Sequence, residues 1–174
     1  MGKQHGFYFD QERCIGCQSC EVACKQFHGI KADTISYRKV SDTTNGNYPD
    51  VKRIFVNISC MHCGKPACVA VCPAKAISKR IEDGIVVVDQ DKCIGCHACL
   101  SACPFGVPNY ADGVMHKCDL CLTQNLATGS KSRCAAACTT QALQSGSMEE
   151  LVRIAQQKAA AKISNATALS DLLS

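Results

Sequence analysis

The chain has 174 residues, 16 cysteines and a formal net charge of +4, with 5% aromatic residues and no tryptophan. No segment approaches the ~20 consecutive apolar residues of a transmembrane helix. The lysines and arginines form no block or stripe of the kind that binds nucleic acid. The composition therefore predicts neither direct membrane insertion nor a nucleic-acid partner. With so few aromatic residues, small modules would have marginal apolar cores, so the cysteines must supply cohesion.

The cysteines fall into four groups of four, and none is left over. The groups are Cys14, Cys17, Cys20 and Cys24; Cys60, Cys63, Cys68 and Cys72; Cys93, Cys96, Cys99 and Cys103; and Cys118, Cys121, Cys134 and Cys138. The first and third groups read C-x2-C-x2-C-x3-C, the spacing that binds 4Fe-4S clusters through thiolates. Gly16 and Gly95 permit the sharp turn that such a loop needs close to inorganic sulfide. Pro73 and Pro104 reproduce the C-P ending of the ferredoxin motif.

In chain order, the first expected elements are a strand at residues 7–9, a helix over about 18–27 and a strand over residues 53–58. Residues 29–50, with Asn45-Gly46 and Pro49, are interpreted as a connector between cysteine groups. Further along, short helices are expected at about 66–71, 97–102 and 133–137. Residues 76–78 and 85–89 predict two strands joined by a turn at Glu82-Asp83-Gly84.

The C-terminal part predicts one long helix. Residues 122–133 are expected to form a long excursion within the fourth cysteine group. After that group, Ser147 and Glu150 form a capping box, which marks a helix start. Leu151, Ile154, Ala155 and Lys158 then recur at helical spacing. We predict an amphipathic helix that packs against its own chain rather than against a partner.

An internal repeat suggests how the groups pair. Residues 9–24 (FDQERCIGCQSCEVAC) and 88–103 (VDQDKCIGCHACLSAC) are the same motif displaced by 79 positions, which indicates a duplicated unit. The second and fourth groups also resemble each other. The predicted hairpin lies between the second and third groups, as it does between the two motifs of a ferredoxin, so these two groups form one module. The first and fourth groups must then pair across that insertion. We predict that residues 7–9 pair antiparallel with residues 142–144.

In two-cluster ferredoxins the last cysteine of each group ligates the other cluster, and applying this rule yields four 4Fe-4S clusters. The predicted ligand sets are Cys14, Cys17, Cys20 and Cys138 (cluster 1); Cys24, Cys118, Cys121 and Cys134 (cluster 2); Cys60, Cys63, Cys68 and Cys103 (cluster 3); and Cys72, Cys93, Cys96 and Cys99 (cluster 4).

The predicted class is α+β, with two bacterial-ferredoxin-like modules of short helices and small antiparallel sheets, one inserted in the other. Module 1 comprises residues 1–45 plus 112–146, and module 2 comprises residues 46–111. Residues 147–174 form a C-terminal helical tail.

Proteins with many cysteines commonly use them in disulfides or in structural zinc sites. A disulfide-stapled secreted domain is usually shorter and begins with a signal peptide, whereas the start MGKQHGFYFDQERC has no apolar stretch of that kind. Structural zinc also takes four thiolates, but usually as two pairs rather than three plus one. His62, His97 and His116 are interpreted as neighbours of the sites rather than ligands.

The second group, C-x2-C-x4-C-x3-C, and the widely gapped fourth group complete a layout that resembles the four-cluster electron-transfer subunit of the dimethyl sulfoxide reductase family of molybdenum and tungsten enzymes. The resemblance covers about residues 5–145. It implies a non-catalytic subunit that passes electrons between a molybdopterin-containing catalytic subunit and a quinone-linked membrane anchor. Some relatives carry tryptophan at the position of Cys63 or Cys96. This chain has cysteine at both, so four cubane clusters are expected.

No nucleophile motif or phosphate-binding loop is present, which agrees with a non-catalytic role. The alternative is a free polyferredoxin, or an accessory electron carrier of hydrogenase or formate dehydrogenase. The resemblance also leaves two locations open for a chain without its own signal. It can be cytoplasmic, or it can be exported to the periplasmic side together with a signal-bearing partner.

Overall fold

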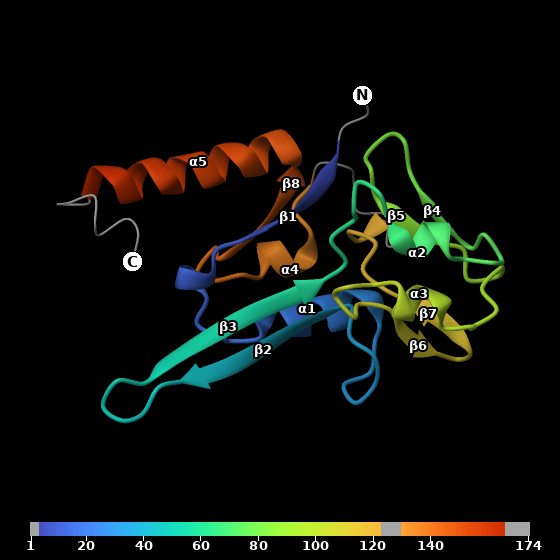
Figure 1. Ribbon diagram of the computed structural model, residues 1–174, viewed down its shortest axis with the longest axis horizontal. Helices are drawn as coiled ribbons and strands as arrows, with labels where there is room; N and C mark the ends of the chain where they lie inside the picture. The colour runs from blue at the N-terminus through green and yellow to red at the C-terminus, as the bar shows by residue number, and fades with distance from the viewer. Residues whose placement is uncertain (1–3, 123–129, 166–174) are drawn as a thin grey trace.

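The computed structural model describes residues 4–122 and 130–165. Within these ranges the strands form four separate two-stranded antiparallel sheets, and short helices lie between them (Figure 1). This arrangement confirms the predicted α+β class of small sheets and short helices with a C-terminal helix. Most of the predicted excursion at 122–133, and residues 166–174 of the predicted tail, lie outside the described residues.

The first sheet joins the two ends of the described chain. Strand β1 (His5–Phe9) pairs antiparallel with β8 (Leu143–Ser147), and Phe9 lies opposite Leu143. The ladder continues one step further, because the Asp10 amide donates to the Ala142 carbonyl at 2.7 Å. The pairing predicted from the repeat is therefore confirmed. Phe7 and Phe9 pack on a core formed by the buried residues Cys20, Cys24, Cys134, Ala135 and Leu143.

Short helices form at the predicted positions, and each contains at least one cysteine of its group. Helix α1 (Ser19–His28) ends where Gly29 adopts φ +65° and its amide bonds to the Gln26 and Lys25 carbonyls. A 3-10 turn, η1 (Gln11–Arg13), precedes the first loop and is capped by the Asp10 carboxylate. The remaining short helices are α2 (Ala67–Ala70), α3 (Ala98–Ser101) and α4 (Arg133–Ala136), and α4 packs against α1.

The segment predicted as a connector contains a long strand, so that prediction was wrong in part. Strand β2 (Arg38–Asn45) pairs over its whole length with β3 (Lys52–Ser59). The sequence of β2 is mostly polar because, apart from Arg38, its side chains are half-buried or exposed. Ladder hydrogen bonds with β3, rather than a buried apolar face, hold it in place. Residues 46–51, which include Gly46 and Pro49 of the predicted connector, join the two strands.

The second half of the molecule carries two small hairpins around one core. The predicted hairpin is confirmed as β4 (Ile77–Lys79) and β5 (Val86–Val88). A second hairpin, β6 (Asn109–Ala111) and β7 (Val114–His116), was not predicted. Its turn, Asp112-Gly113, has φ values of +51° and +80°, and an Asp-Gly pair is the sequence signal for such a turn. Ile77, Val86, Cys99 and Met115 form the core between these elements.

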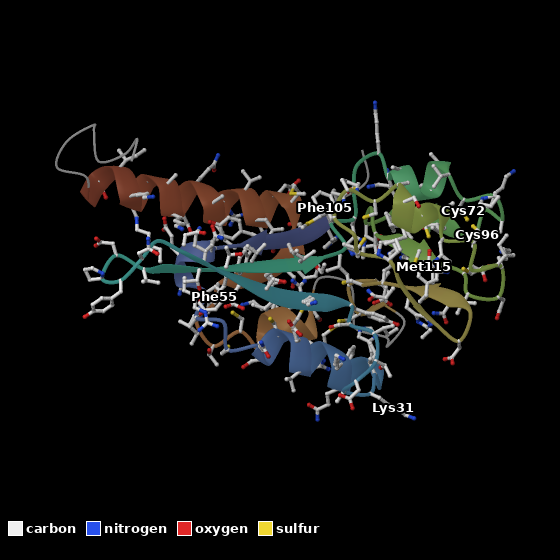
Figure 2. The ribbon with its side chains drawn as sticks, turned by 60° about the horizontal axis from the view of Figure 1, so that its bottom comes forward. Lys31, Phe55, Cys72, Cys96, Phe105 and Met115 are labelled. Atoms are coloured by element: carbon white, nitrogen blue, oxygen red, sulfur yellow. The ribbon has the colours of Figure 1, made fainter. Side chains whose placement is uncertain are left out.

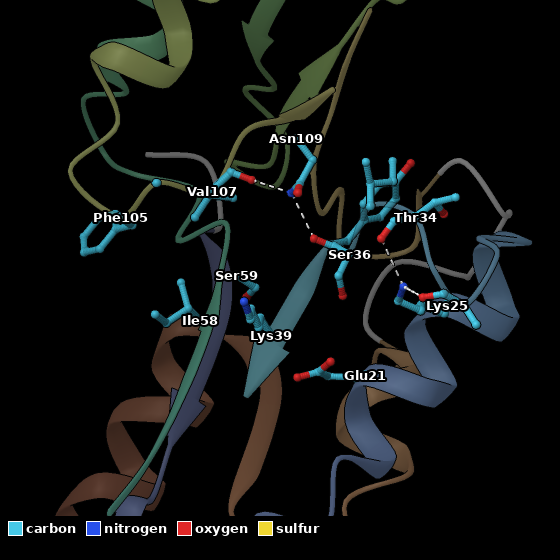
Figure 3. A pocket seen from close by; sticks show the side chains of 14 residues that line it. Glu21, Lys25, Thr34, Ser36, Lys39, Ile58, Ser59, Phe105, Val107 and Asn109 are labelled. Atoms are coloured by element: carbon cyan, nitrogen blue, oxygen red, sulfur yellow. Dashed lines mark hydrogen bonds between the residues drawn. The ribbon is translucent and has the colours of Figure 1, made fainter. Parts of the chain in front are cut away.

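A cavity lies between the part of the molecule with α1 and the β2–β3 hairpin and the part with the β4–β5 and β6–β7 hairpins (Figure 3). It lies between α1, the segment 32–39, the end of β3 and residues 105–109, and no described residue in its lining is a cysteine. The Asn109 side-chain amide donates to the Ser36 carbonyl at 2.9 Å and ties the two halves together. The predicted module boundaries fall within the β2–β3 and β6–β7 hairpins, and the division into two modules stays a prediction.

Helix α5 (Met148–Asn165) lies along β1 and β8 (Figure 1). Its capping box forms as predicted, with the Glu150 amide donating to the Ser147 hydroxyl at 3.3 Å and the Ser147 amide donating to the Glu150 carboxylate at 2.9 Å. Leu151 is 4% exposed, and Lys158 pairs with Asp10 at 2.6 Å. The helix therefore packs on its own chain. None of the helices in the described ranges is long and apolar enough to cross a membrane.

Candidate iron-sulfur sites

Four cysteines from two groups line one cavity in the second half of the molecule. They are Cys72, Cys93, Cys96 and Cys99, the residues predicted for cluster 4. Figure 2 shows Cys72, Cys96 and Met115 gathered at this end of the molecule. The Tyr110 hydroxyl lies 3.0 Å from the Cys99 sulfur, and the Met115 amide donates to the Cys93 sulfur at 3.4 Å. Hydrogen bonds of this kind stabilise thiolate charge.

A second cavity is lined by Cys60, Cys63, Cys68 and Cys103, the residues predicted for cluster 3. Its other walls are mainly apolar and include Val86, Phe105 and Val107. Met115, which is 1% exposed, lies in the walls of both cavities. Met115 is therefore a wall that the two cysteine-lined cavities share.

Cysteines of the first and fourth groups lie together in the part of the molecule that contains α1, α4 and the β1–β8 sheet. Cys24 lies beside Cys134 and Cys121, and Cys118 lies beside Cys134 and Cys24. The structure thus brings together the four cysteines predicted for cluster 2. Among the residues predicted for cluster 1, Cys20 and Cys138 share the core around Leu143, and Cys17 lies beside Thr139. Cys14 directly follows η1.

Burial sets the protonation of the thiols in this half. It raises the pKa of Cys24 to about 12, and those of Cys20 and Cys121 to about 11. These thiols are protonated at neutral pH unless a metal ion displaces the proton. Cys17 is different, because it is exposed and the Ser19 hydroxyl hydrogen-bonds its sulfur at 3.4 Å, which lowers its pKa.

The donor set fits iron-sulfur clusters. All sixteen cysteines lie in the described ranges, and the structure forms no disulfide between them. Among the residues that the structure describes, no three His, Cys, Asp or Glu side chains converge on a single-ion site. In each of the two cavities the four cysteines instead surround a shared space, and a cubane needs one thiolate at each of its four irons.

The histidines near the sites have other contacts. His62 is 1% exposed, and its Nδ1 accepts a hydrogen bond from the Val86 amide at 3.0 Å. Burial lowers the pKa of His62 to about 3, so the ring is neutral. His97 stacks on Tyr110 with ring centroids 3.9 Å apart, and His116 Nδ1 lies 3.1 Å from the Tyr37 hydroxyl.

Two loop glycines have the role that the sequence predicts. Gly16 and Gly95 have φ values of +67° and +63°, a region that glycine occupies without strain. A Cβ at Gly16 would lie 2.6 Å from Phe55 Cδ1, and one at Gly95 would overlap the Gly113 carbonyl oxygen. Gln18 and His97, two residues further on in each repeat, are also left-handed, at +60° and +63°. The two copies of the repeat thus share their loop conformation.

Comparisons with known proteins agree with this geometry. A family profile described as a 4Fe-4S dicluster domain matches residues 51–148, and one described as a 4Fe-4S binding domain matches residues 5–26. The sequence is 42% identical over 161 residues to the B subunit of anaerobic dimethyl sulfoxide reductase from Escherichia coli (strain K12), a match that covers 87% of this protein and 77% of that subunit. It belongs to the 4Fe-4S subunit family of dimethyl sulfoxide reductase-type enzymes.

Other members of this 4Fe-4S subunit family are similarly close. Probable anaerobic dimethyl sulfoxide reductase chain YnfG of Escherichia coli (strain K12) is also 42% identical, over 87% of this chain and 77% of its own length. Thiosulfate reductase electron transfer subunit PhsB of Salmonella typhi is 40% identical, over 86% of this chain and 79% of its own length.

Sequence analysis missed the polar residues that contact the cysteines from outside the four groups. Besides Tyr110, these include Asn57, whose side-chain amide donates to the Cys20 sulfur at 3.3 Å. Neither residue lies in a spacing pattern, and each reaches its cysteine through a strand of a hairpin that was not predicted in full. Met115 was missed for the same reason, because the β6–β7 hairpin places it between two cavities.

Proposed function

We propose that this iron-sulfur subunit relays electrons through four 4Fe-4S clusters between a molybdopterin-containing catalytic subunit and a second redox partner. The observation that carries the proposal is the pair of cavities lined by four cysteines each, with Met115 in both walls. The ligand sets proposed are the four predicted from the spacing, so each cysteine group lends its last member to the neighbouring cluster. The chain itself converts no substrate.

Apolar walls suit a relay because burial and hydrogen bonding tune the potential of a cluster. The shared wall at Met115 gives electrons a short route between clusters 3 and 4. We further propose that groups one and four form one ferredoxin-like module and that groups two and three form the other. Each module then holds two clusters.

Two exposed cysteine loops are the surfaces at which redox partners are expected to bind. Cys17 and Cys96 are the exposed cysteines of the chain. Beside them Ile15 is 62% exposed and Ile94 is 66% exposed. An apolar residue at the most accessible edge of a cluster loop favours contact with another protein surface. By family analogy, the Cys17 end faces the catalytic subunit and the Cys96 end lies nearer the quinone side.

The decisive experiment is anaerobic purification of the native complex, with metal analysis and electron paramagnetic resonance. We expect co-purification of a molybdopterin subunit, about sixteen iron atoms per chain and four cluster signals. A stable holo-monomer without that subunit would instead favour a free electron carrier. Zinc in place of iron would refute the clusters.

The ligand assignment has its own test. Cys96→Ser is expected to remove or convert one cluster and leave the other three unchanged. Ile94→Ser is the matched control, because it introduces the same side chain two residues away in the same exposed loop and removes no sulfur. An unchanged four-cluster spectrum in Cys96→Ser would refute the assignment of that cysteine.

A further inference from the structure

Arg38 is a buried cation inside the half of the molecule that contains the first and fourth cysteine groups. It begins β2 and is 2% exposed. Its guanidinium carbon lies 4.2 Å from the centre of the Phe7 ring on β1. Its Nη1 donates a hydrogen bond to the Asn57 side-chain oxygen on the paired strand β3. The guanidinium is thus fixed by one aromatic ring and one amide.

Within the described part of the molecule, the charge of Arg38 has no carboxylate partner, because none of the ion pairs there includes Arg38. A buried charge without a counterion is strongly unfavourable. Burial alone would lower the pKa of Arg38, but the nearby sulfurs of Cys134, Cys118 and Cys20 raise it above its usual value. Compensation for the Arg38 charge must therefore come from whatever those sulfurs bind.

Two donors of Arg38 also lack acceptors. Nε and Nη2 are buried and have no hydrogen-bond partner among the described residues. Buried donors of this kind are rare in native proteins unless a ligand or water satisfies them. An iron-sulfur cluster supplies both the missing hydrogen-bond acceptors and the missing negative charge. Its sulfurs accept hydrogen bonds, and the oxidised cluster with four thiolates carries a charge of about −2.

Asn57 holds this arrangement together. Its oxygen accepts from Arg38, while its Nδ2 donates to the Cys20 sulfur at 3.3 Å. Asn57 therefore connects the guanidinium to a ligand of cluster 1. Cys134 and Cys118, which also act on Arg38, belong to the proposed cluster 2. Arg38 thus lies near cysteines that are proposed for two different clusters.

We propose that Arg38 hydrogen-bonds the clusters held by Cys20 and Cys134 and raises their reduction potentials, with Asn57 as its positioning residue. The proposal depends on the clusters of the proposed function. In the step concerned, one electron from a redox partner reduces the cluster, whose total charge changes from about −2 to about −3, and no bond to a ligand breaks. A fixed positive charge stabilises the more negative state.

The test is a redox titration of the native complex, followed by electron paramagnetic resonance. In Arg38→Met we expect the equilibrium constant for reduction to fall at least about tenfold for one or two steps, which is about 59 mV for a one-electron couple. The remaining steps keep their potentials. Arg53→Met is the matched control, since Arg53 lies on the same hairpin and over the Phe55 ring but is exposed. It is expected to shift no step.

Two further variants keep the proposal falsifiable if Arg38→Met loses iron. Arg38→Lys keeps the charge and is expected to retain most of the potential. Asn57→Asp keeps the side-chain shape but places a negative charge against the guanidinium, so the same steps are expected to shift downward. If Arg38→Met or Asn57→Asp keeps its iron and its cluster potentials are nevertheless unchanged, the proposal is overturned. Iron content and signal intensity of the unmodified complex test the clusters themselves, so the two failures are distinguishable.

Discussion

Substitution of Gly95 by alanine is expected to destabilise one cluster site selectively. Gly95 lies between Cys93 and Cys96 with φ +63°, and a Cβ there would overlap the Gly113 carbonyl oxygen in the β6–β7 turn. The left-handed conformation costs alanine about 1–2 kcal/mol. Overlap with a backbone atom, which moves only with its hairpin, adds about 1–3 kcal/mol. The total of about 2–5 kcal/mol corresponds to at least a ~30-fold change in the local opening equilibrium.

The assay is the rate at which an iron chelator removes iron from the anaerobic holoprotein. Because chelator access requires the loop to open, Gly95→Ala is expected to release one quarter of the iron at least about 30-fold faster. Gly29→Ala is the matched control, since Gly29 has φ +65° and a Cβ there would meet no atom within 4 Å. It pays the conformational cost of about 1–2 kcal/mol alone, so its iron release is expected to accelerate less than that of Gly95→Ala and by no more than about 30-fold. Equal rates for the two variants would refute the role of the Gly95–Gly113 contact.

Three other predictions concern helix α5 and the clusters as a whole. Leu151→Ala is expected to accelerate amide hydrogen exchange in α5 about 30-fold or more, since a buried leucine contributes about 2–5 kcal/mol. Val152→Ala, at a neighbouring position that is 48% exposed, should change it less than about threefold; equal effects would contradict the packing of α5. Ser147→Ala removes the capping hydrogen bond at 3.3 Å to the Glu150 amide and should speed exchange in the first turn about fivefold, whereas unchanged exchange would mean that the cap contributes nothing. Removal of iron is expected to abolish cooperative thermal unfolding measured by circular dichroism, and a cluster-free chain that still unfolds cooperatively would disprove this dependence.

Sequence patterns predicted the cysteine groups because thiolate spacing and glycine turns are local requirements. The repeat of residues 9–24 in residues 88–103 also predicted the β1–β8 pairing, although its strands are far apart in the chain. Strand β2 was missed because its exposed polar side chains carry no alternating pattern. The β6–β7 hairpin was missed although its Asp112-Gly113 turn was readable.

The hydrogen bonds and charges around the cysteines could not be predicted from the spacing of the cysteines. Asn57 reaches the Cys20 sulfur only because β3 pairs with β2. Arg38 is at the start of a strand that looks like a polar connector, so neither its burial nor its unpaired charge had a signal in the sequence. Such residues become visible only when the two strands of a hairpin are placed beside the cluster loops.

Pairing of β1 with β8 has a consequence for biosynthesis. Residues 5–9 find their partner strand only after residues 143–147 have left the ribosome. Until then Cys14, Cys17 and Cys20 lack the neighbours that arrive with the fourth cysteine group, while the second and third groups are already linked by a local hairpin. Long-range pairing is slow compared with local pairing. The strand that pairs with β1 is therefore among the last parts of the chain to be made, and a product truncated before residue 143 has no partner for residues 5–9.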